Sequence, residues 1–253
     1  FERYLRKYKN SPFRHSARIT ISRAFALIRK YDKALEMLDR VESDSSARAF
    51  QAEAAYRKGD VHFQAKDFKA SIEAYQRAKN KFPHKWATFP NAQYNLAEAL
   101  FDEKEYFDSL TSYVEFLRTF PKSSHGGFAM TRIGELLGIL GAPQKKVLGA
   151  YLESMFRYQG SEGANIAKIR VTSSRMIGMK PKDIEATVED LSEFVATSDL
   201  PDLIPFYRVA ISDGYFNRGE FEKARDFLVE YYKENPTSKS LPVIKTRIVR
   251  TII

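Results

Sequence analysis

Hydrophobic residues recur along this chain at intervals of three and four residues, in stretches that end at polar turns or prolines. The stretch from Tyr113 to Ser123 shows the pattern well, because Tyr113, Phe116 and Leu117 fall on one face of a helix before Pro121. Such spacing predicts an amphipathic helix, and a proline placed here predicts its end. Similar spacing covers nearly the whole chain, and it predicts helices throughout and no strand.

The stretch that begins at Tyr113 is repeated along the chain. Further copies begin at positions 1, 38, 75, 151, 188 and 228, so that neighbouring copies lie 37 to 40 residues apart. A fixed period of this length predicts an array of stacked helix pairs in which each pair contacts only its neighbours.

Each copy belongs to a predicted pair of helices. We expect these pairs at residues 11–30 with 34–41, 46–65 with 68–82, 92–103 with 106–116, 128–140 with 147–155, 166–177 with 181–195, and 206–216 with 221–232. We expect residues 1–253 to form one solenoid of about six helix pairs, with partial repeats at both ends, as a piece of a longer protein.

The repeated residues resemble those of the tetratricopeptide repeat family. In the second pair, Gly59 stands in the middle of the first helix, Phe68 opens the second helix, and Ser71, Tyr75 and Pro83 follow at the family's spacing. The resemblance implies an all-α fold, a right-handed superhelical solenoid of antiparallel helix pairs, which acts as a protein-interaction scaffold.

The repeat is three or four residues longer than the usual 34, and the extra length lies near the closing proline. The ending Phe116-Leu117-x-x-Phe120-Pro121-x-Ser123 is similar to that of bacterial envelope proteins of the barrel-assembly lipoprotein and Tol–Pal coordinator types. This similarity implies a periplasmic or cell-envelope location. The absence of cysteine fits a periplasmic and a cytoplasmic location equally well.

Composition adds one alternative to this interpretation. The chain carries a formal net charge of +9, and its Lys and Arg residues gather toward both ends. Basic ends favour nucleic acid or anionic lipid as partners, so a binder of either stays open beside the scaffold, as does an accessory domain of an enzyme that lies outside the chain.

The sequence offers no catalytic or metal-binding motif. Its four histidines, at positions 15, 62, 84 and 125, stand apart, without the i, i+4 spacing of a metal-binding helix. We therefore expect no enzyme activity, no cofactor and no metal.

In the family, the first helix of each pair lines a concave face, which gives the candidate binding residues. They combine aromatic rings with carboxylates, so that we expect an apolar partner segment bearing Lys or Arg; alternatively, the rings serve only for packing. The candidates are Tyr56, Asp60, Phe63, Gln64, Tyr94, Glu98, Phe101, Asp102, Glu135, Asp213 and Phe216.

Overall fold

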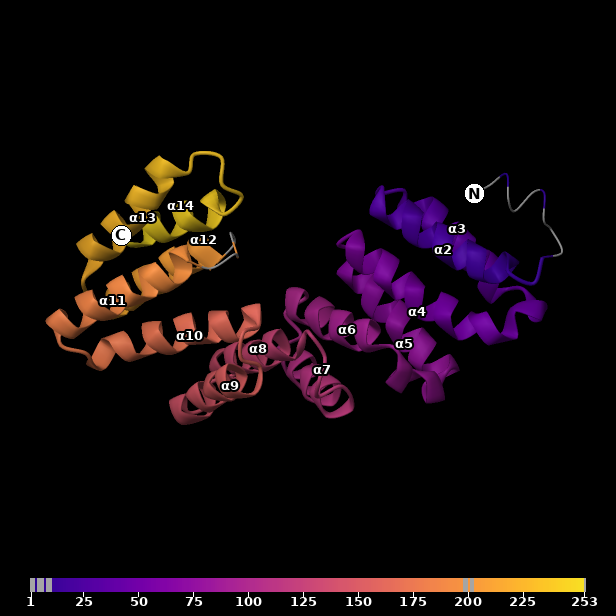
Figure 1. The fold of residues 1–253 in the computed structure, drawn as a ribbon, viewed down its shortest axis with the longest axis horizontal. Helices are drawn as coiled ribbons and strands as arrows, with labels where there is room; N and C mark the ends of the chain where they lie inside the picture. The colour runs from indigo at the N-terminus through magenta and orange to yellow at the C-terminus, as the bar shows by residue number, and fades with distance from the viewer. Residues whose placement is uncertain (1–2, 4–6, 8–10, 198–199, 201–202, 253) are drawn as a thin grey trace. The chain divides into compact units, whose positions relative to one another are not determined.

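The computed structural model describes residues 3, 7, 11–197, 200 and 203–252 (Figure 1). The copy that begins at residue 1 and the predicted break at 198–202 lie largely outside the described residues. Within them, the chain forms helices and no strand, which confirms the all-α class. The α-helices are α2 (Arg14–Leu27), α3 (Tyr31–Glu42), α4 (Arg48–Gln64), α5 (Phe68–Lys81), α6 (Pro90–Asp102), α7 (Tyr106–Thr119), α8 (Gly126–Ile139), α9 (Gln144–Arg157), α10 (Glu162–Arg175), α11 (Pro181–Ala196), α12 (Leu203–Asn217), α13 (Phe221–Glu234) and α14 (Leu241–Arg250).

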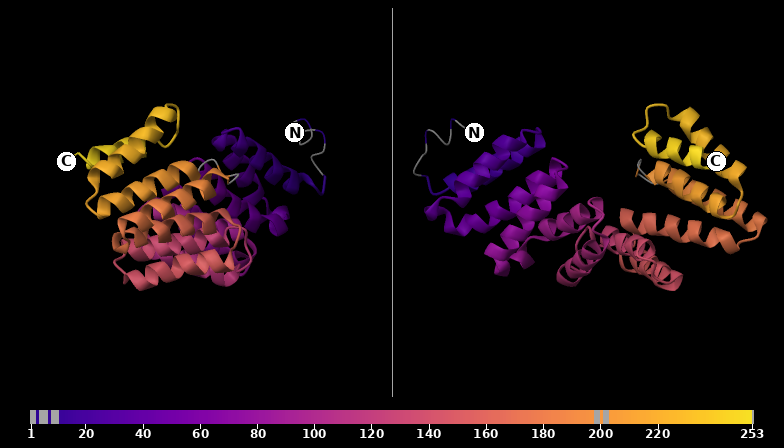
Figure 2. Two further views of the ribbon diagram at one scale, coloured as in Figure 1. Left: turned by 60° about the vertical axis from the view of Figure 1, so that its left-hand side comes forward. Right: turned by 180° about the vertical axis from the view of Figure 1, so that it is seen from behind.

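The chain divides into two compact units. Unit 1 comprises residues 1–123 with 136–141, and unit 2 comprises residues 124–135 with 142–253. Within each unit, successive helices run in alternate directions and pack on their neighbours (Figures 1 and 2). The single continuous solenoid expected for residues 1–253 therefore stays a prediction.

The described part of unit 1 forms three antiparallel pairs, α2–α3, α4–α5 and α6–α7. A small residue in α4 and another in α6, Gly59 and Ala97, let the second helix of each pair approach closely. A Cβ atom on Gly59 would lie only 2.3 Å from the ring of Tyr75, which is fully buried. The hydroxyl of Ser71 donates to the Gly59 carbonyl at 3.0 Å, and Ser109 donates in the same way to Ala97 at 2.8 Å. The repeat is thus one of contacts as well as of sequence, with an offset of 38 residues between these two pairs.

The turn inside each pair of unit 1 repeats as well. Arg29, Lys66 and Lys104 follow the ends of α2, α4 and α6 and have φ between 58° and 66°, in the left-handed region. Gly219 holds the same place after α12, with φ of 82°. In each case the next residue's N–H bonds back five residues, as the Asp67 N–H does to the His62 carbonyl at 3.0 Å. This is the Schellman ending, which satisfies carbonyls left free at a helix C-terminus.

The linker between α5 and α6 places the single tryptophan of the chain in the core of unit 1. Trp86 is buried, and its ring lies 5.7 Å from that of Tyr56. Its indole N–H donates to Glu115 at 2.8 Å, and the Lys79 ammonium lies 4.9 Å from its ring centre. Trp86 therefore joins α4, α5 and α7.

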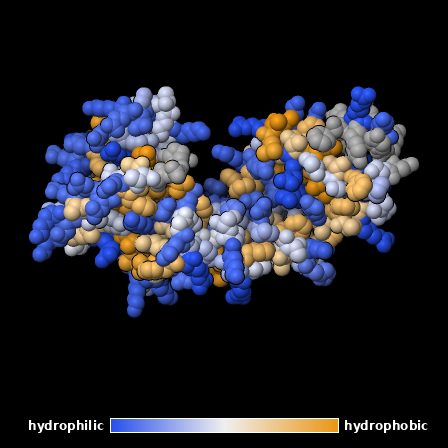
Figure 3. Space-filling view, viewed as in Figure 1, coloured by the Kyte–Doolittle hydropathy of each residue, from blue (hydrophilic) through white to orange (hydrophobic). Residues whose placement is uncertain are grey.

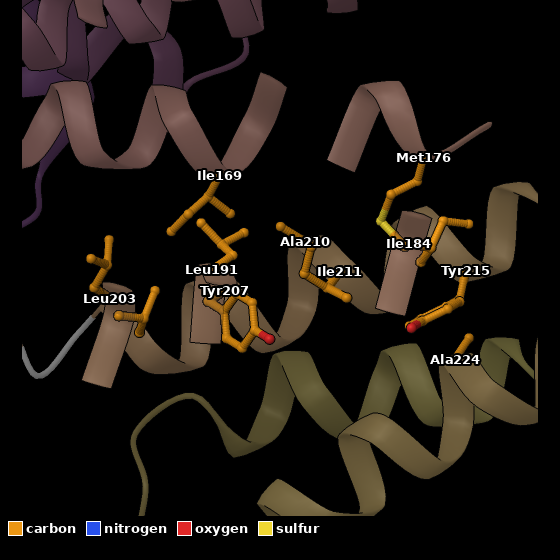
Figure 4. Packing of buried hydrophobic residues seen from close by; sticks show 11 residues of the cluster. Ile169, Met176, Ile184, Leu191, Leu203, Tyr207, Ala210, Ile211, Tyr215 and Ala224 are labelled. Carbon is orange, nitrogen blue, oxygen red and sulfur yellow. The ribbon is translucent and has the colours of Figure 1, made fainter. Parts of the chain in front are cut away.

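The core of unit 2 gathers on α12. Ile169 from α10, Ile184 and Leu191 from α11, and Ala224 from α13 surround Tyr207 and its neighbours on α12 (Figure 4). At Gly163, a Cβ atom would lie 2.2 Å from backbone atoms of Gly127 and Phe128, so α10 crosses the start of α8 at a distance that only glycine allows.

Candidate functional site

The first helices of the three pairs in unit 1 together line a groove. It has a volume of about 190 Å³, and α2, α4 and α6 each contribute side chains to it. Its lining residues are Ser22, Arg23, Ala26, Leu27, Arg57, Asp60, Val61, Gln64, Asn91 and Asn95.

Asp60 sits at the base of the groove and is 8% exposed. Its carboxylate accepts hydrogen bonds from the Tyr75 hydroxyl at 2.7 Å, from Arg57 at 3.0 Å and from the Asn95 amide at 3.2 Å. A buried carboxylate needs such partners to offset the loss of hydration. The charge of Asp60 is therefore compensated within the chain, and this residue fixes the groove walls.

Amide side chains form the walls above Asp60. Asn91 and Gln64 are exposed, whereas Asn95 is half-buried and donates to both Asp60 and the Tyr75 hydroxyl. Each amide both donates and accepts hydrogen bonds. The groove can therefore bind groups that both donate and accept hydrogen bonds, of which the peptide backbone is the most common.

Two arginines add positive charge to the same groove. Arg23 on α2 is exposed, with no ion-pair partner among the described residues. Arg57 on α4 contacts Asp60, but its buried Nε donates no hydrogen bond and lies 3.6 Å from Glu53. Arg23 is therefore the cation of the groove that is open to a ligand, and it favours one that brings an acceptor.

The apolar part of the groove lies at the C-terminal end of α2. Leu27 is 80% exposed, and the adjacent Ile28 is 59% exposed. Figure 3 shows hydrophobic residues gathered at this end of the α2–α3 pair, among the mainly hydrophilic residues of the face in view.

Of the predicted binding residues, only Asp60 and Gln64 line this groove. The prediction that Tyr56 faces a partner is wrong, because its side chain is 1% exposed and its hydroxyl donates to the Phe82 carbonyl at 3.1 Å. Burial raises the pKa of Tyr56 to about 12. Tyr56 thus belongs to the core of unit 1, against Trp86 and Phe89.

The other predicted aromatics of unit 1 are half-buried and pack inside their own helix pairs. Phe63 lies 5.7 Å from Phe68, and Phe101 lies 5.7 Å from Tyr106, so each joins the first helix to the start of the second. Tyr94 packs on Tyr113, and both hydroxyls donate to Glu98. Asp102, at the end of α6, is exposed.

The predicted residues of unit 2 are engaged in contacts between neighbouring helices. Glu135 accepts hydrogen bonds from Arg132 at 2.6 Å and from Arg170 at 2.7 Å. Asp213 pairs with Arg247 at 2.9 Å. Phe216 carries the Arg250 guanidinium 4.0 Å from its ring centre and packs on Phe221.

These carboxylates share one pattern of partners along the chain. Asp60 pairs with Asn95 and Glu135 with Arg170, both 35 residues later, and Asp213 pairs with Arg247, 34 residues later. The recurring acids that the sequence shows are therefore links between successive first helices. Arg23, Arg57, Asn91 and Asn95 were not among the predicted binding residues. The i, i+4 spacing of the two asparagines, on the face that also carries Glu98, was the available signal.

The basic ends are partly neutralised in the same way. Arg14 and Arg18 on α2 approach Asp44 at 3.1 Å and 3.8 Å, and Arg247 and Arg250 approach Asp213. Among the described residues, no group of three or more histidine or acidic side chains could hold a metal ion. In the same part of the chain, no helix combines the length and hydropathy needed to cross a bilayer. The expected absence of a metal site stays a prediction.

Comparisons with known proteins agree with this architecture. Residues 1–105 match the family described as Tetratricopeptide repeat-like domain. The apo form of RapI has a similar structure, with a TM-score of 0.63 and 14% sequence identity over 94% of this chain and 74% of that one. A Rap protein complexed with Competence and Sporulation Factor matches over the same shares, with a TM-score of 0.53 and 12% identity. A search of curated protein sequences finds no match. The tetratricopeptide-type fold expected from the sequence is thereby confirmed.

Proposed function

We propose that unit 1 binds an extended segment of a partner polypeptide in the groove between α2, α4 and α6. The observation that carries this proposal is that three consecutive first helices direct amide and guanidinium groups into one groove. The fold supports it, because one of the similar structures is of a Rap protein in a complex with Competence and Sporulation Factor.

The amides determine which form of polypeptide fits. An extended segment exposes its backbone N–H and C=O groups, whereas a helical segment uses them internally. Gln64, Asn91 and Asn95 can bond to an extended backbone without regard to its sequence, since each presents both a donor and an acceptor. Leu27, Ala26 and Val61 offer a place for one apolar side chain.

The charges favour an acidic or neutral segment over the basic one expected from sequence. Two arginines line the groove against one aspartate, and the hydrogen bonds of Asp60 go to groups within the chain. A lysine or arginine of the partner would have to displace Arg57 from Asp60. An acidic side chain would instead meet the exposed guanidinium of Arg23, with charge-assisted hydrogen bonds, beside the positive charge of Arg57.

The test is a selection of peptides from a random display library against the full chain, followed by affinity measurement. The double variant Arg23→Ala, Asn91→Ala removes two exposed groups of the groove. Loss of one charged and one neutral hydrogen bond corresponds to about 2–4 kcal/mol, so selected peptides should bind at least ~30-fold more weakly.

A matched control removes the same two residue types elsewhere in unit 1. Arg118 on α7 and Asn80 on α5 are both exposed and lie outside the groove. The variant Arg118→Ala, Asn80→Ala should bind the selected peptides like the parent chain. Equal losses in both variants, or full binding by the groove variant, would refute the proposal, and so would a preference for basic peptides.

A binder of nucleic acid or anionic lipid is less well supported, because four arginines near the ends of the chain contact Asp44 or Asp213.

We also propose a cell-envelope location and a non-catalytic role for the chain. The envelope location is supported by the similar repeat ending at residues 116–123, and fractionation of cells of the source organism tests it.

A further inference from the structure

A second cavity lies in unit 1, on a different face of α4 from the groove. It measures about 560 Å³ and opens between α3, α4 and α5. We call it the alanine hollow, because Ala55, Ala74 and Ala78 contribute to its lining and are all buried. The other lining residues are Leu35, Asp39, Glu42, Lys58, His62, Arg77 and Lys81.

The hollow departs from the repeat pattern. With the offset of 38 residues fixed by the two serine hydrogen bonds, the positions of Lys58, His62 and Ala78 correspond to Leu96, Leu100 and Phe116 in the next pair. These three apolar side chains are buried, and Leu96 and Leu100 belong to the same hydrophobic cluster as Ala78. At these three positions the second pair therefore carries small or ionisable residues where the third carries buried apolar ones, and local departures from a consistent pattern are typical of functional sites.

Most of the charges in the hollow compensate one another. The Lys58 ammonium bonds to Asp39 and, at 2.6 Å, to Glu42, which in turn accepts from Lys81 at 2.7 Å. Burial opposes the charge of Glu42, but the hydrogen bonds from Lys58 and Lys81 outweigh it and hold the pKa of Glu42 below its usual value. The four residues form an alternating row of two negative and two positive charges.

Arg77 is a further cation of the hollow and takes no part in this row of ion pairs. It lies one turn before Lys81 on α5, is exposed, and has no hydrogen-bond or ion-pair partner among the described residues. His62 faces the same hollow from α4. The hollow thus combines an apolar base with one uncompensated guanidinium.

We infer that the alanine hollow is a binding site for a small amphiphilic anion, whose carboxylate or phosphate head pairs with Arg77 while a compact apolar body covers the three alanines. Guanidinium binds both kinds of head through two parallel hydrogen bonds. The volume falls within the range of small-molecule sites, about 300–1,000 Å³. This inference does not depend on the peptide groove.

The test uses four probes on the full chain: benzoate, phenyl phosphate, benzyl alcohol and inorganic phosphate. NMR would follow the methyl signals of the three alanines and the Nε–H signal of Arg77. Benzoate or phenyl phosphate should shift both sets of signals. The probe that binds more tightly identifies the preferred head group. Benzyl alcohol lacks the charge and inorganic phosphate lacks the apolar body, so each should bind at least ~10-fold more weakly.

Variants separate the hollow from general attraction of anions. Arg77→Gln should weaken binding of the better probe at least ~10-fold, whereas Arg118→Gln, an exposed arginine on α7, should leave it unchanged. Ala78→Leu, which partly fills the hollow, should weaken binding without loss of helical circular dichroism. Binding that survives Arg77→Gln, or an absence of alanine methyl shifts with both anionic probes, would overturn the inference.

Discussion

At the scale of single residues, replacement of two different glycines by alanine should have opposite effects on stability. Gly59 faces the buried ring of Tyr75, whereas a Cβ atom on Gly149 in α9 would meet no atom within 4 Å. Gly59→Ala forces the ring or the helix to move, and such overpacking costs about 1–3 kcal/mol. Gly149→Ala should stabilise by about 0.5–1 kcal/mol, since alanine is the better helix former. Urea denaturation followed by circular dichroism measures both, and a stabilising Gly59→Ala would contradict this packing.

Tyr113 fills the space between α6 and α7 and is fully buried, as the repeat pattern predicts. Tyr113→Ala should destabilise by about 3–5 kcal/mol, because large buried aromatics leave a cavity when truncated. Phe107 on the same helix is 70% exposed, so Phe107→Ala should change the free energy of unfolding by less than about 0.5 kcal/mol. Similar losses for the two variants in a denaturant titration would show that Tyr113 does not have this role.

Burial of tyrosines predicts unfolding in alkaline solution. The pKa values of Tyr56 and Tyr151 are raised from 10.0 to about 12, in both cases mainly by burial. Because the folded pKa exceeds the unfolded one, this stabilisation is complete below pH 10 and declines as the pH rises toward 12. Stability measured between pH 9 and 12 should fall steeply, and less steeply in Tyr151→Phe. Equal slopes in both proteins would contradict the burial of this hydroxyl.

At the scale of elements, apolar spacing was sufficient to predict the helices. The helix expected at 46–65 is observed at Arg48–Gln64, and the one expected from residue 92 begins at Pro90. The Schellman turns were not predicted, because Arg29, Lys66 and Lys104 carry side chains at a position where glycine is the usual signal.

One of these turns offers a direct test. Lys66 has φ of 62°, a conformation that costs a residue with a Cβ about 1 kcal/mol or more, and Gly219 stands at the equivalent place after α12. Lys66→Gly should therefore stabilise the chain by up to ~1 kcal/mol, despite the greater freedom of glycine in the unfolded chain. The control is Lys69→Gly in the first turn of α5, which should destabilise. A loss of stability in Lys66→Gly would contradict the left-handed conformation.

The candidate site could be predicted only in part from the sequence. The repeat placed Asp60 and Gln64 on the ligand face, but helical spacing does not show which partner a side chain meets on the next first helix. For Asp60 and Glu135 that partner lies 35 residues later, and its identity depends on tertiary packing. Tyr56 was misassigned for a related reason: its ring turns toward Trp86, in a linker whose path the spacing does not determine.

At the scale of the whole molecule, the two compact units predict unfolding in more than one step. Trp86 is the single tryptophan and lies in unit 1, so its fluorescence reports that unit, whereas circular dichroism reports both. Gly163→Ala would push α10 from the backbone of Gly127 and destabilise unit 2. In a repeat array, such a change is felt mainly by neighbouring repeats. The circular dichroism transition of this variant should therefore begin at lower urea than the fluorescence transition. Coincident transitions would show that the units unfold together.

The bond between Asp60 and Asn95 also sets the direction in which a ligand would cross the groove. The residue equivalent to Asp60 in the third pair is Glu98, yet Asp60 contacts Asn95, which lies one turn nearer the start of α6. A helical turn rises ~5.4 Å, and packed helices lie ~8–10 Å apart. A segment that follows the line from Asp60 on α4 to Asn95 on α6 would therefore cross the helices obliquely, about 30° from the perpendicular. Its N-to-C polarity would then decide which of its carbonyls meet Asn91, so the reversed peptide sequence should not be an equivalent ligand.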